Sequence, residues 1–186
     1  MKKVSDKTFG IIGTIMFFGI IFGYFTEFEY IDNTIKVAKL LMYSAVVGLV
    51  VGFLVALLAI SDSSNSVEKT RNYLFVILAF AIAFPMLGLK TNRWFANKTA
   101  EIVPFTFVKQ KPVLSKPFGQ MKFESTAPTY YLVYLAYKGE TIKIKSPKQW
   151  VNNSQSGKEV YLPVFRGLWG FEIVDIQGLK PDADTI

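Results

Sequence analysis

The chain has 186 residues, a formal net charge of +7, and neither cysteine nor histidine. Without these two residue types it can form no disulfide, no typical zinc site and no Ser-His-Asp triad, so thiol, imidazole and zinc chemistries are excluded. Hydrophobic residues make up 51% of the chain, and the mean hydropathy is +0.32. That apolar content exceeds the amount that a soluble domain of this size usually carries.

Three long stretches in the first half of the sequence contain no charged residue. They are Thr8–Thr26, Leu40–Ser61 and Asn72–Leu89, of 19, 22 and 18 residues. At a rise of about 1.5 Å per residue, a helix of each length would cross a hydrocarbon core roughly 30 Å thick. The sequence therefore predicts a membrane domain of residues 1–98 with three transmembrane helices, approximately at 8–26, 40–61 and 72–89.

Charged residues beside the predicted spans bear on their orientation. Lys2, Lys3 and Lys7 precede the first span, whereas acidic residues follow it. Basic flanks favour the cytoplasm, so we expect a multi-pass protein of the cytoplasmic (inner) membrane with its N-terminus in the cytoplasm and its C-terminal domain outside. Counted over the short flanks of all three spans, five basic residues lie on each side, so the prediction depends mainly on the first span.

Small residues line one face of the second predicted span, where they recur every four positions. Small side chains at this spacing let another helix approach closely. Two alternatives stay open: the small faces pack the spans of this chain on one another, or they contact a partner protein or a second copy of the chain. The residues concerned are Ser44, Gly48, Gly52 and Ala56, with a shorter version at Gly19 and Gly23 in the first span.

The residues that follow the third span combine a basic side chain with two aromatic ones. They are Arg93, Trp94 and Phe95. This combination is typical of the headgroup region, so all three are predicted at the membrane interface.

The C-terminal half has the alternation and turn residues of a β domain. Tyr130–Tyr137 and the run of residues 140–145 are joined by Lys138-Gly139, a pair typical of a β-hairpin. A two-residue turn there places Leu135 opposite Ile142 and Tyr134 opposite Lys143, which separates apolar from polar side chains.

Further strands are predicted on both sides of this hairpin. They are Ile102–Val108, Val160–Phe165 and Leu168–Ile176. Pro104 is expected to confine the first to an edge or a strand start, and Pro163 to place the second at an edge. We therefore expect a small all-β domain over residues 99–178, an SH3-like or OB-like barrel or a sandwich. A frayed tail of residues 179–186 is expected to follow it.

The hairpin also offers a candidate surface for a ligand or a partner, composed of Tyr130, Tyr134, Lys143 and Trp150. The alternative is that these side chains pack across the strands. The sequence has neither a GxxxxGK nor a GxGxxG phosphate loop, and its basic residues are scattered, so no cofactor, no metal and no nucleic acid are predicted.

These observations lead to a non-enzymatic accessory or scaffold protein of the membrane, with the lipid bilayer and another membrane protein or a second copy as its partners. The spans would pack on the partner's helices, and the β domain would dock a protein or an envelope component. One alternative is a homo-oligomeric channel with a soluble β domain. A second alternative is a membrane-tethered hydrolase that uses carboxylates.

Overall fold

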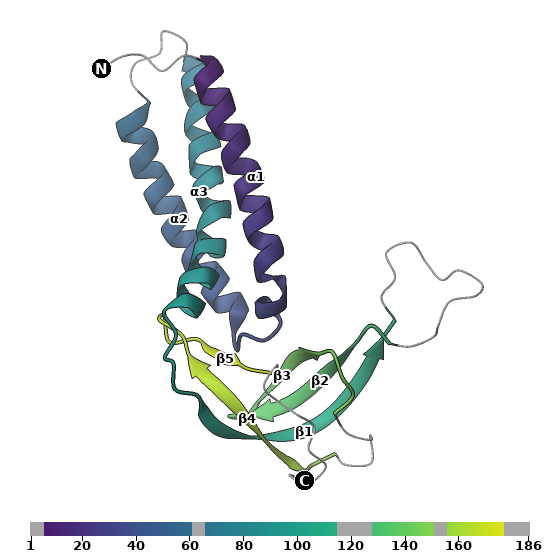
Figure 1. The fold of residues 1–186 in the computed structure, drawn as a ribbon. Coiled ribbons are helices and arrows are strands. Elements are labelled where there is room, and N and C mark those ends of the chain that lie inside the picture. The colour runs from purple at the N-terminus through teal and green to yellow at the C-terminus, as the bar shows by residue number, and fades with distance from the viewer. Residues whose placement is uncertain (1–5, 61–65, 115–127, 151–155, 177–186) are drawn as a thin grey trace, which may run out of the picture. The chain divides into compact units, whose positions relative to one another are not determined.

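The computed structural model describes residues 6–60, 66–114, 128–150 and 156–176. Figure 1 shows three helices, α1 (Asp6–Ile31), α2 (Val37–Ala59) and α3 (Ser66–Trp94). The strands that follow are β1 (Glu101–Val113), β2 (Tyr130–Tyr137), β3 (Glu140–Ser146), β4 (Glu159–Arg166) and β5 (Glu172–Val174). The predicted tail of residues 179–186 lies outside the described residues.

The chain divides into a helical unit and a β unit. The helical unit comprises Met1–Ile31 and Lys36–Phe95, and the β unit comprises Asp32–Ile35 and Ala96–Ile186. The short linker between α1 and α2 therefore belongs to the β unit, although it lies more than 60 residues before the first strand. Sequence patterns indicated a domain change only near residue 98 and attached no strand to this linker.

Two helices of the helical unit are long and apolar enough to cross a bilayer, α2 over Val37–Leu58 and α3 over Ser66–Trp94. The apolar part of α1 among the described residues is the shorter segment Gly13–Phe28. A span needs about 20 largely apolar residues. The apolar segment of α1 is shorter than that, although the helix itself continues through Glu27 to Ile31. The prediction of three spans is therefore corrected to two candidate spans.

Close contact between α2 and α3 depends on two glycines. A Cβ atom on Gly48 would lie 2.6 Å from the carbonyl oxygen of Phe80, and one on Gly52 would lie 3.0 Å from the Cα atom of Ile77. Either atom would overlap the neighbouring backbone, so only glycine permits this approach.

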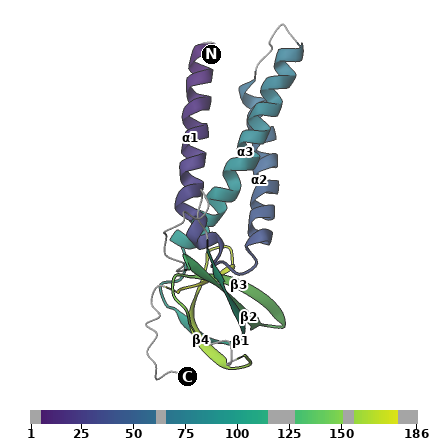
Figure 2. The same ribbon diagram turned by 90° about the vertical axis from the view of Figure 1, so that its right-hand side faces the viewer.

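The rest of the small-residue series divides between close contact and open space. Ala56 is fully buried, and Gly88 of α3 faces the Ser44 side chain. In α1, Gly23 faces the Met86 side chain of α3, whereas Gly19 has open space around it. Figure 2 shows α3 alongside α2 in a second view. The structure thus places most of this series between helices of one chain.

The large apolar side chains of α2 and α3 that point away from this contact are exposed. On α2, Val50, Leu54 and Leu58 recur every four residues and are 56%, 51% and 83% exposed. On α3, Leu74, Leu78 and Ile82 repeat the same spacing and are also exposed. This pattern is the reverse of the one in a soluble bundle, whose outer face is polar.

The β unit is a curled, antiparallel five-stranded sheet that forms a half-barrel, with the strand order β3-β2-β1-β4-β5 (Figure 1). The predicted hairpin register is confirmed, since Leu135 pairs with Ile142 and Tyr134 with Lys143. The turn residues Lys138 and Gly139 both have positive φ angles, as a tight two-residue hairpin turn requires. The buried core of the β unit includes Phe105, Phe107, Val133, Leu135, Ile144, Leu162 and Val164.

The linker between α1 and α2 hydrogen-bonds to both outer strands of this sheet. The Ile35 amide donates to the Glu172 carbonyl at 2.8 Å, and the Val174 amide donates to the Asn33 carbonyl at 2.9 Å. The Asn33 side-chain oxygen also accepts the Lys145 amide of β3 at 3.3 Å. The linker thus occupies the open side of the half-barrel and satisfies backbone groups at both of its edges.

Both proline-containing strands lie inside the sheet, so the predicted edge position of Val160–Phe165 is wrong, whereas Pro104 lies near the start of β1, one of the two places predicted for it. β1 is the central strand and β4 lies between β1 and β5. Pro104 is tolerated because β1 pairs only with β4 over residues 101–105, and its pairing with β2 begins at Thr106. Pro163 likewise precedes the β4 segment that pairs with β5. Pro104 therefore lies where β1 has β4 as its single ladder partner, so its missing N–H breaks no ladder bond with β2, whereas the Pro163 carbonyl also accepts the Asp175 amide, just after β5, at 2.9 Å.

The predicted strand Leu168–Ile176 is shorter in the structure. β5 contains only Glu172–Val174, because residues 167–171 form a turn closed by the Gly170 amide, which donates to the Gly167 carbonyl at 2.9 Å. Gly170 has a φ angle of 80°, a conformation that glycine adopts without strain.

Replacement of either packing glycine should weaken the α2–α3 contact. We expect Gly48→Leu and Gly52→Leu each to destabilise the detergent-solubilised protein by about 1–3 kcal/mol, because the added side chain must displace the α3 backbone. Thermal unfolding followed by circular dichroism measures this loss. Gly19→Leu is the matched control, since it adds the same side chain where there is space, and an equal loss in that variant would contradict the assignment.

Loss of the Asn33 side-chain oxygen should open the β unit locally. Asn33→Leu leaves the Lys145 amide without its acceptor, and we expect a destabilisation of about 1–3 kcal/mol. Hydrogen exchange at the Lys145 amide should accelerate in this variant. Asn33→Asp retains an oxygen acceptor and should leave that exchange slow; fast exchange in both variants would mean that the hydrogen bond is not the cause.

Candidate functional site

Three adjacent strands place four lysines on one face of the sheet. In the strand register, Lys109 of β1 lies beside Tyr134 of β2, which lies beside Lys143 of β3. Two residues further along, Lys111, Leu132 and Lys145 form the next row. We call this surface the lysine–tyrosine face; it consists of Lys109, Lys111, Tyr130, Leu132, Tyr134, Lys143 and Lys145.

A bulge in β1 puts two of these lysines on this face. Phe105 and Phe107 point into the core, and simple alternation would send Lys109 after them. The register with β2 shifts between Phe107 and Lys109, so one extra residue reverses the alternation. Lys109 and Lys111 therefore lie on the exposed face, and Gln110 is buried instead.

Two tyrosine rings support lysine side chains on this face. The Lys109 ammonium lies 5.1 Å from the centre of the Tyr134 ring, and the Lys145 ammonium lies 4.5 Å from the centre of the Tyr130 ring. The negative face of an aromatic ring attracts such a cation and restrains a long, flexible side chain. Lys109 and Lys145 are thus held over the sheet and not only extended into solvent.

Within the described parts of β1, β2 and β3 this face carries lysines and no carboxylate, whereas Glu159 of the neighbouring strand β4, opposite Thr106, lies on the same side of the sheet. In the described parts of β1, β2 and β3 the acidic residues are Glu101 and Glu140, and both lie at strand ends in the core-facing set of positions. Lys109 and Lys143 are two strand spacings apart, roughly 10 Å. Four ammonium groups at this spacing raise the local positive potential, so the face can attract an anionic group.

The structure brings together three of the four residues that the sequence proposed as a ligand surface. Tyr130, Tyr134 and Lys143 belong to the lysine–tyrosine face. Trp150 does not, because it packs against the core and its Nε1 donates to the Ser146 hydroxyl at 2.7 Å. Its backbone amide also donates to the Gln110 side chain at 3.0 Å.

Sequence reasoning missed the other lysines for two different reasons. The hairpin register predicted from the sequence also places Lys145 opposite Leu132, so Lys145 could have been included in the predicted surface. Lys109 and Lys111 required the pairing of β1 with β2 and the bulge in it, which no local pattern indicates.

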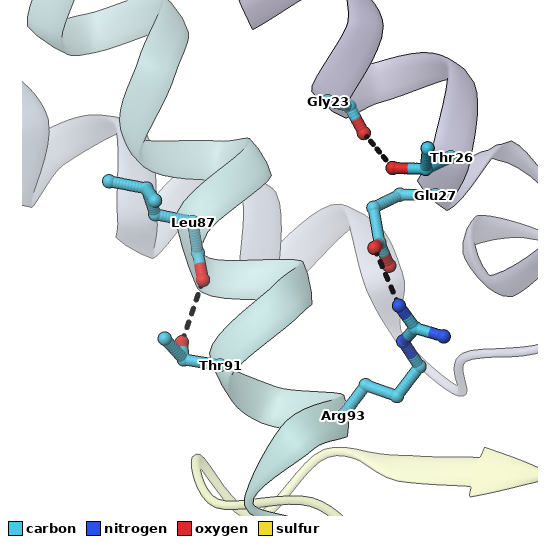
Figure 3. Close-up of polar contacts among 6 residues, drawn as sticks. All are labelled: Gly23, Thr26, Glu27, Leu87, Thr91 and Arg93. Carbon is cyan, nitrogen blue, oxygen red and sulfur yellow. Dashed lines mark hydrogen bonds and ion pairs between the residues drawn. The ribbon is translucent and has the colours of Figure 1, made fainter. Parts of the chain in front are cut away.

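A buried ion pair joins α1 to α3 inside the helical unit. Arg93 Nη2 donates to Glu27 Oε1 at 2.8 Å, and the Glu27 side chain is completely buried (Figure 3). The Arg93 guanidinium also lies 3.9 Å from the centre of the Tyr30 ring. Glu27 Oε2 and Arg93 Nε are buried and have no hydrogen-bond partner among the residues that the structure describes, so within that part of the chain the pair is only partly satisfied.

The contacts of Arg93 add an ion pair to the group predicted at the membrane interface, and that interfacial position stays a prediction. Trp94 and Phe95 are each 65% exposed, as interfacial aromatic residues would be. Arg93 instead points to Glu27, a residue that the sequence assigned to the flank of the first span. In the sequence, the only indication of this ion pair was the opposite charge of Glu27 and Arg93, which follow the first and third predicted spans.

The β unit contains another ion pair, which is exposed, unlike the Glu27–Arg93 pair of the helical unit. The Lys138 ammonium in the hairpin turn lies 3.0 Å from a Glu172 carboxylate oxygen of β5. The Tyr137 hydroxyl first, and the Glu172 carboxylate second, raise the pKa of Lys138 above its ordinary value. A raised folded-state pKa stabilises the fold below the unfolded pKa of about 10.4, and that stability is lost as the pH rises through the folded value.

Removal of one partner of the buried pair should cost more than removal of both. Arg93→Leu leaves the Glu27 carboxylate buried and unpaired, which should destabilise the protein by about 3–5 kcal/mol, and Glu27→Leu should act in the same direction. The double variant should lose clearly less than the sum of the two single losses. Denaturant unfolding of the four proteins in detergent measures this coupling, and additive losses would show that the pair is not coupled.

No family model, curated protein or solved structure matches this chain. The function must therefore be argued from the contacts, burial and charges of the chain itself. Two features offer chemistry for that argument: the exposed apolar sides of α2 and α3, and the lysine–tyrosine face of the β unit.

Proposed function

We propose that this chain is a non-enzymatic accessory protein of a membrane, anchored by α2 and α3, whose β unit docks an anionic component at the membrane surface. The observation that carries the proposal is the exposed apolar surface of α2 and α3. Apolar rows on the sides that face away from the α2–α3 contact require an apolar solvent, and lipid supplies it.

The helix contact itself supports the same conclusion. In a bilayer, helices associate through close packing of small residues, because the surrounding lipid is as apolar as the side chains. Gly48 and Gly52 supply that packing between α2 and α3. Since these glycines contact α3 of the same chain, any partner helix would have to use the outer apolar sides instead.

The chain order supports a hairpin arrangement of the two spans. Asp32–Ile35 and Ala96–Ile186 belong to one unit, so both segments must lie on the same side of a membrane. An even number of crossings between them is required, and α2 and α3 supply two. We retain as a proposal the orientation with the β unit outside the cytoplasm.

The channel alternative loses the feature that suggested it. A pore was expected to use the small face of the second span around a central axis. Gly48 and Gly52 are instead covered by Phe80 and Ile77 of α3, so the small face is occupied within the chain. We therefore favour an anchor with a docking unit over a pore.

A charged residue on the outer side of α2 should prevent stable anchoring. A lysine near the centre of a span costs about 2.5–3.5 kcal/mol, so Val50→Lys with Leu54→Lys should shift the chain from the carbonate-resistant membrane fraction to the soluble or aggregated fraction. Val50→Ala with Leu54→Ala is the matched control and should stay in the membrane. Release of the unaltered chain by alkaline carbonate would refute the anchor.

Cysteine labelling measures the orientation, because the chain contains no cysteine and a single introduced one is then its only thiol. A single cysteine at Lys158 in the β unit should react with a membrane-impermeant maleimide on intact cells. A single cysteine at Ser66, at the start of α3, should react only after permeabilisation. The opposite result would place the β unit in the cytoplasm.

A further inference from the structure

We propose that the lysine–tyrosine face binds the headgroups of an anionic phospholipid bilayer. The inference rests on the proposed function and makes it specific, since it names the chemical class that the β unit docks. A unit tethered to a bilayer meets headgroups at a high effective concentration, so even a weak individual contact becomes populated.

The type and number of the cations fit a lipid surface. All four are lysines, whose compact ammonium groups act as point charges, whereas arginine is the residue that binds a single phosphate or carboxylate in a fixed bidentate geometry. Lysine is also depleted at protein–protein interfaces, where arginine is enriched. An array of lysines without arginine therefore favours a diffuse anionic surface over a folded acidic protein.

The aromatic residues of the face fit the same surface. Tyr130 and Tyr134 combine an apolar ring with a polar hydroxyl, and such residues are enriched at the headgroup level of membranes. Leu132 lies between them in β2 and adds an apolar contact. The face thus presents ammonium groups to the lipid phosphates, and amphipathic and apolar side chains to the boundary between the headgroups and the acyl chains.

The same contacts argue against nucleic acid. A base binds a tyrosine by stacking on its open ring face. On this sheet one face of the Tyr134 ring is covered by Lys109, and one face of the Tyr130 ring by Lys145. Stacking of a base on those faces would have to displace the lysines, whereas a phosphate headgroup binds the ammonium groups where they lie.

The expected strength follows from the charge count. Each lysine near an anionic leaflet strengthens binding by roughly fivefold. Three lysines should therefore contribute on the order of a hundredfold, and the binding should weaken strongly with added salt, because exposed charges are screened.

The test uses the full chain in nanodiscs of phosphatidylcholine, which cover α2 and α3 with neutral lipid. Separate vesicles of phosphatidylcholine are added, either pure or with about 30% phosphatidylglycerol, which gives the vesicles a negative surface potential. Nanodiscs bound to the vesicles are measured by flotation. A second arm places the chain in nanodiscs that themselves contain phosphatidylglycerol. There, a fluorophore on Thr141→Cys, a position on the same side of β3, reports contact with the chain's own bilayer.

The decisive comparison is between two variants of equal charge. Lys109→Gln, Lys111→Gln and Lys143→Gln together remove three exposed lysines of the face. Lys98→Gln, Lys148→Gln and Lys158→Gln together remove three exposed lysines from other segments of the β unit. We expect the first variant to lose on the order of a hundredfold in binding to anionic lipid, in at least one arm, and the second to lose less than tenfold.

Several results would overturn the proposal. One is equal binding to neutral and anionic lipid in both arms, and another is an equal loss in the two triple variants. Binding to immobilised polyglutamate without binding to anionic vesicles would assign the face to an acidic protein. Carbonate extraction of each variant keeps the two proposals separate, because a chain that stays anchored but ignores anionic lipid refutes only the lipid assignment.

Discussion

The β unit depends on four residues that the chain contributes long before its first strand. Asp32–Ile35 supply backbone partners to β5 and a side-chain acceptor to β3, the two outer strands of the half-barrel. An open sheet edge carries unpaired amides and carbonyls, which attract other chains. Occupation of that side by the linker satisfies these groups, so the β unit is completed only when the α1–α2 connection is in place.

The same linker limits how the chain can be threaded through a membrane. A segment that precedes α2 and a domain that follows α3 are hydrogen-bonded to each other, so in the proposed membrane arrangement they lie on the same side. Two crossings between them satisfy this requirement, whereas one does not. Because α2 and α3 are also the two helices long and apolar enough to cross, the hydrogen bonds of the β unit and the composition of the helices agree.

A one-residue bulge determines the chemistry of the exposed sheet face. Before the bulge, β1 sends Phe105 and Phe107 into the core; after it, the same numerical parity sends Lys109 and Lys111 outward. An unbroken strand would bury two ammonium groups among apolar side chains, at a large desolvation cost. The bulge therefore both protects the core and assembles the positive surface on which we base the docking proposal.

The sequence by itself determined the features that depend on neighbours along the chain. Uncharged runs indicated the apolar helices, and alternation around Lys138-Gly139 indicated the hairpin register, because a tight turn fixes which residues face each other. The first uncharged run was predicted to be a span, whereas among the described residues the candidate spans are α2 and α3.

Only the tertiary structure decided the features that depend on contacts distant in sequence. These are the Glu27–Arg93 pair, the close approach of Gly48 and Gly52 to α3, the interior positions of Pro104 and Pro163, and the gathering of Lys109 and Lys111 with Lys143 and Lys145. Each joins residues brought together by helix packing or strand pairing across tens of positions. Local propensity carries no information about such partners, because their energy arises only when the elements meet.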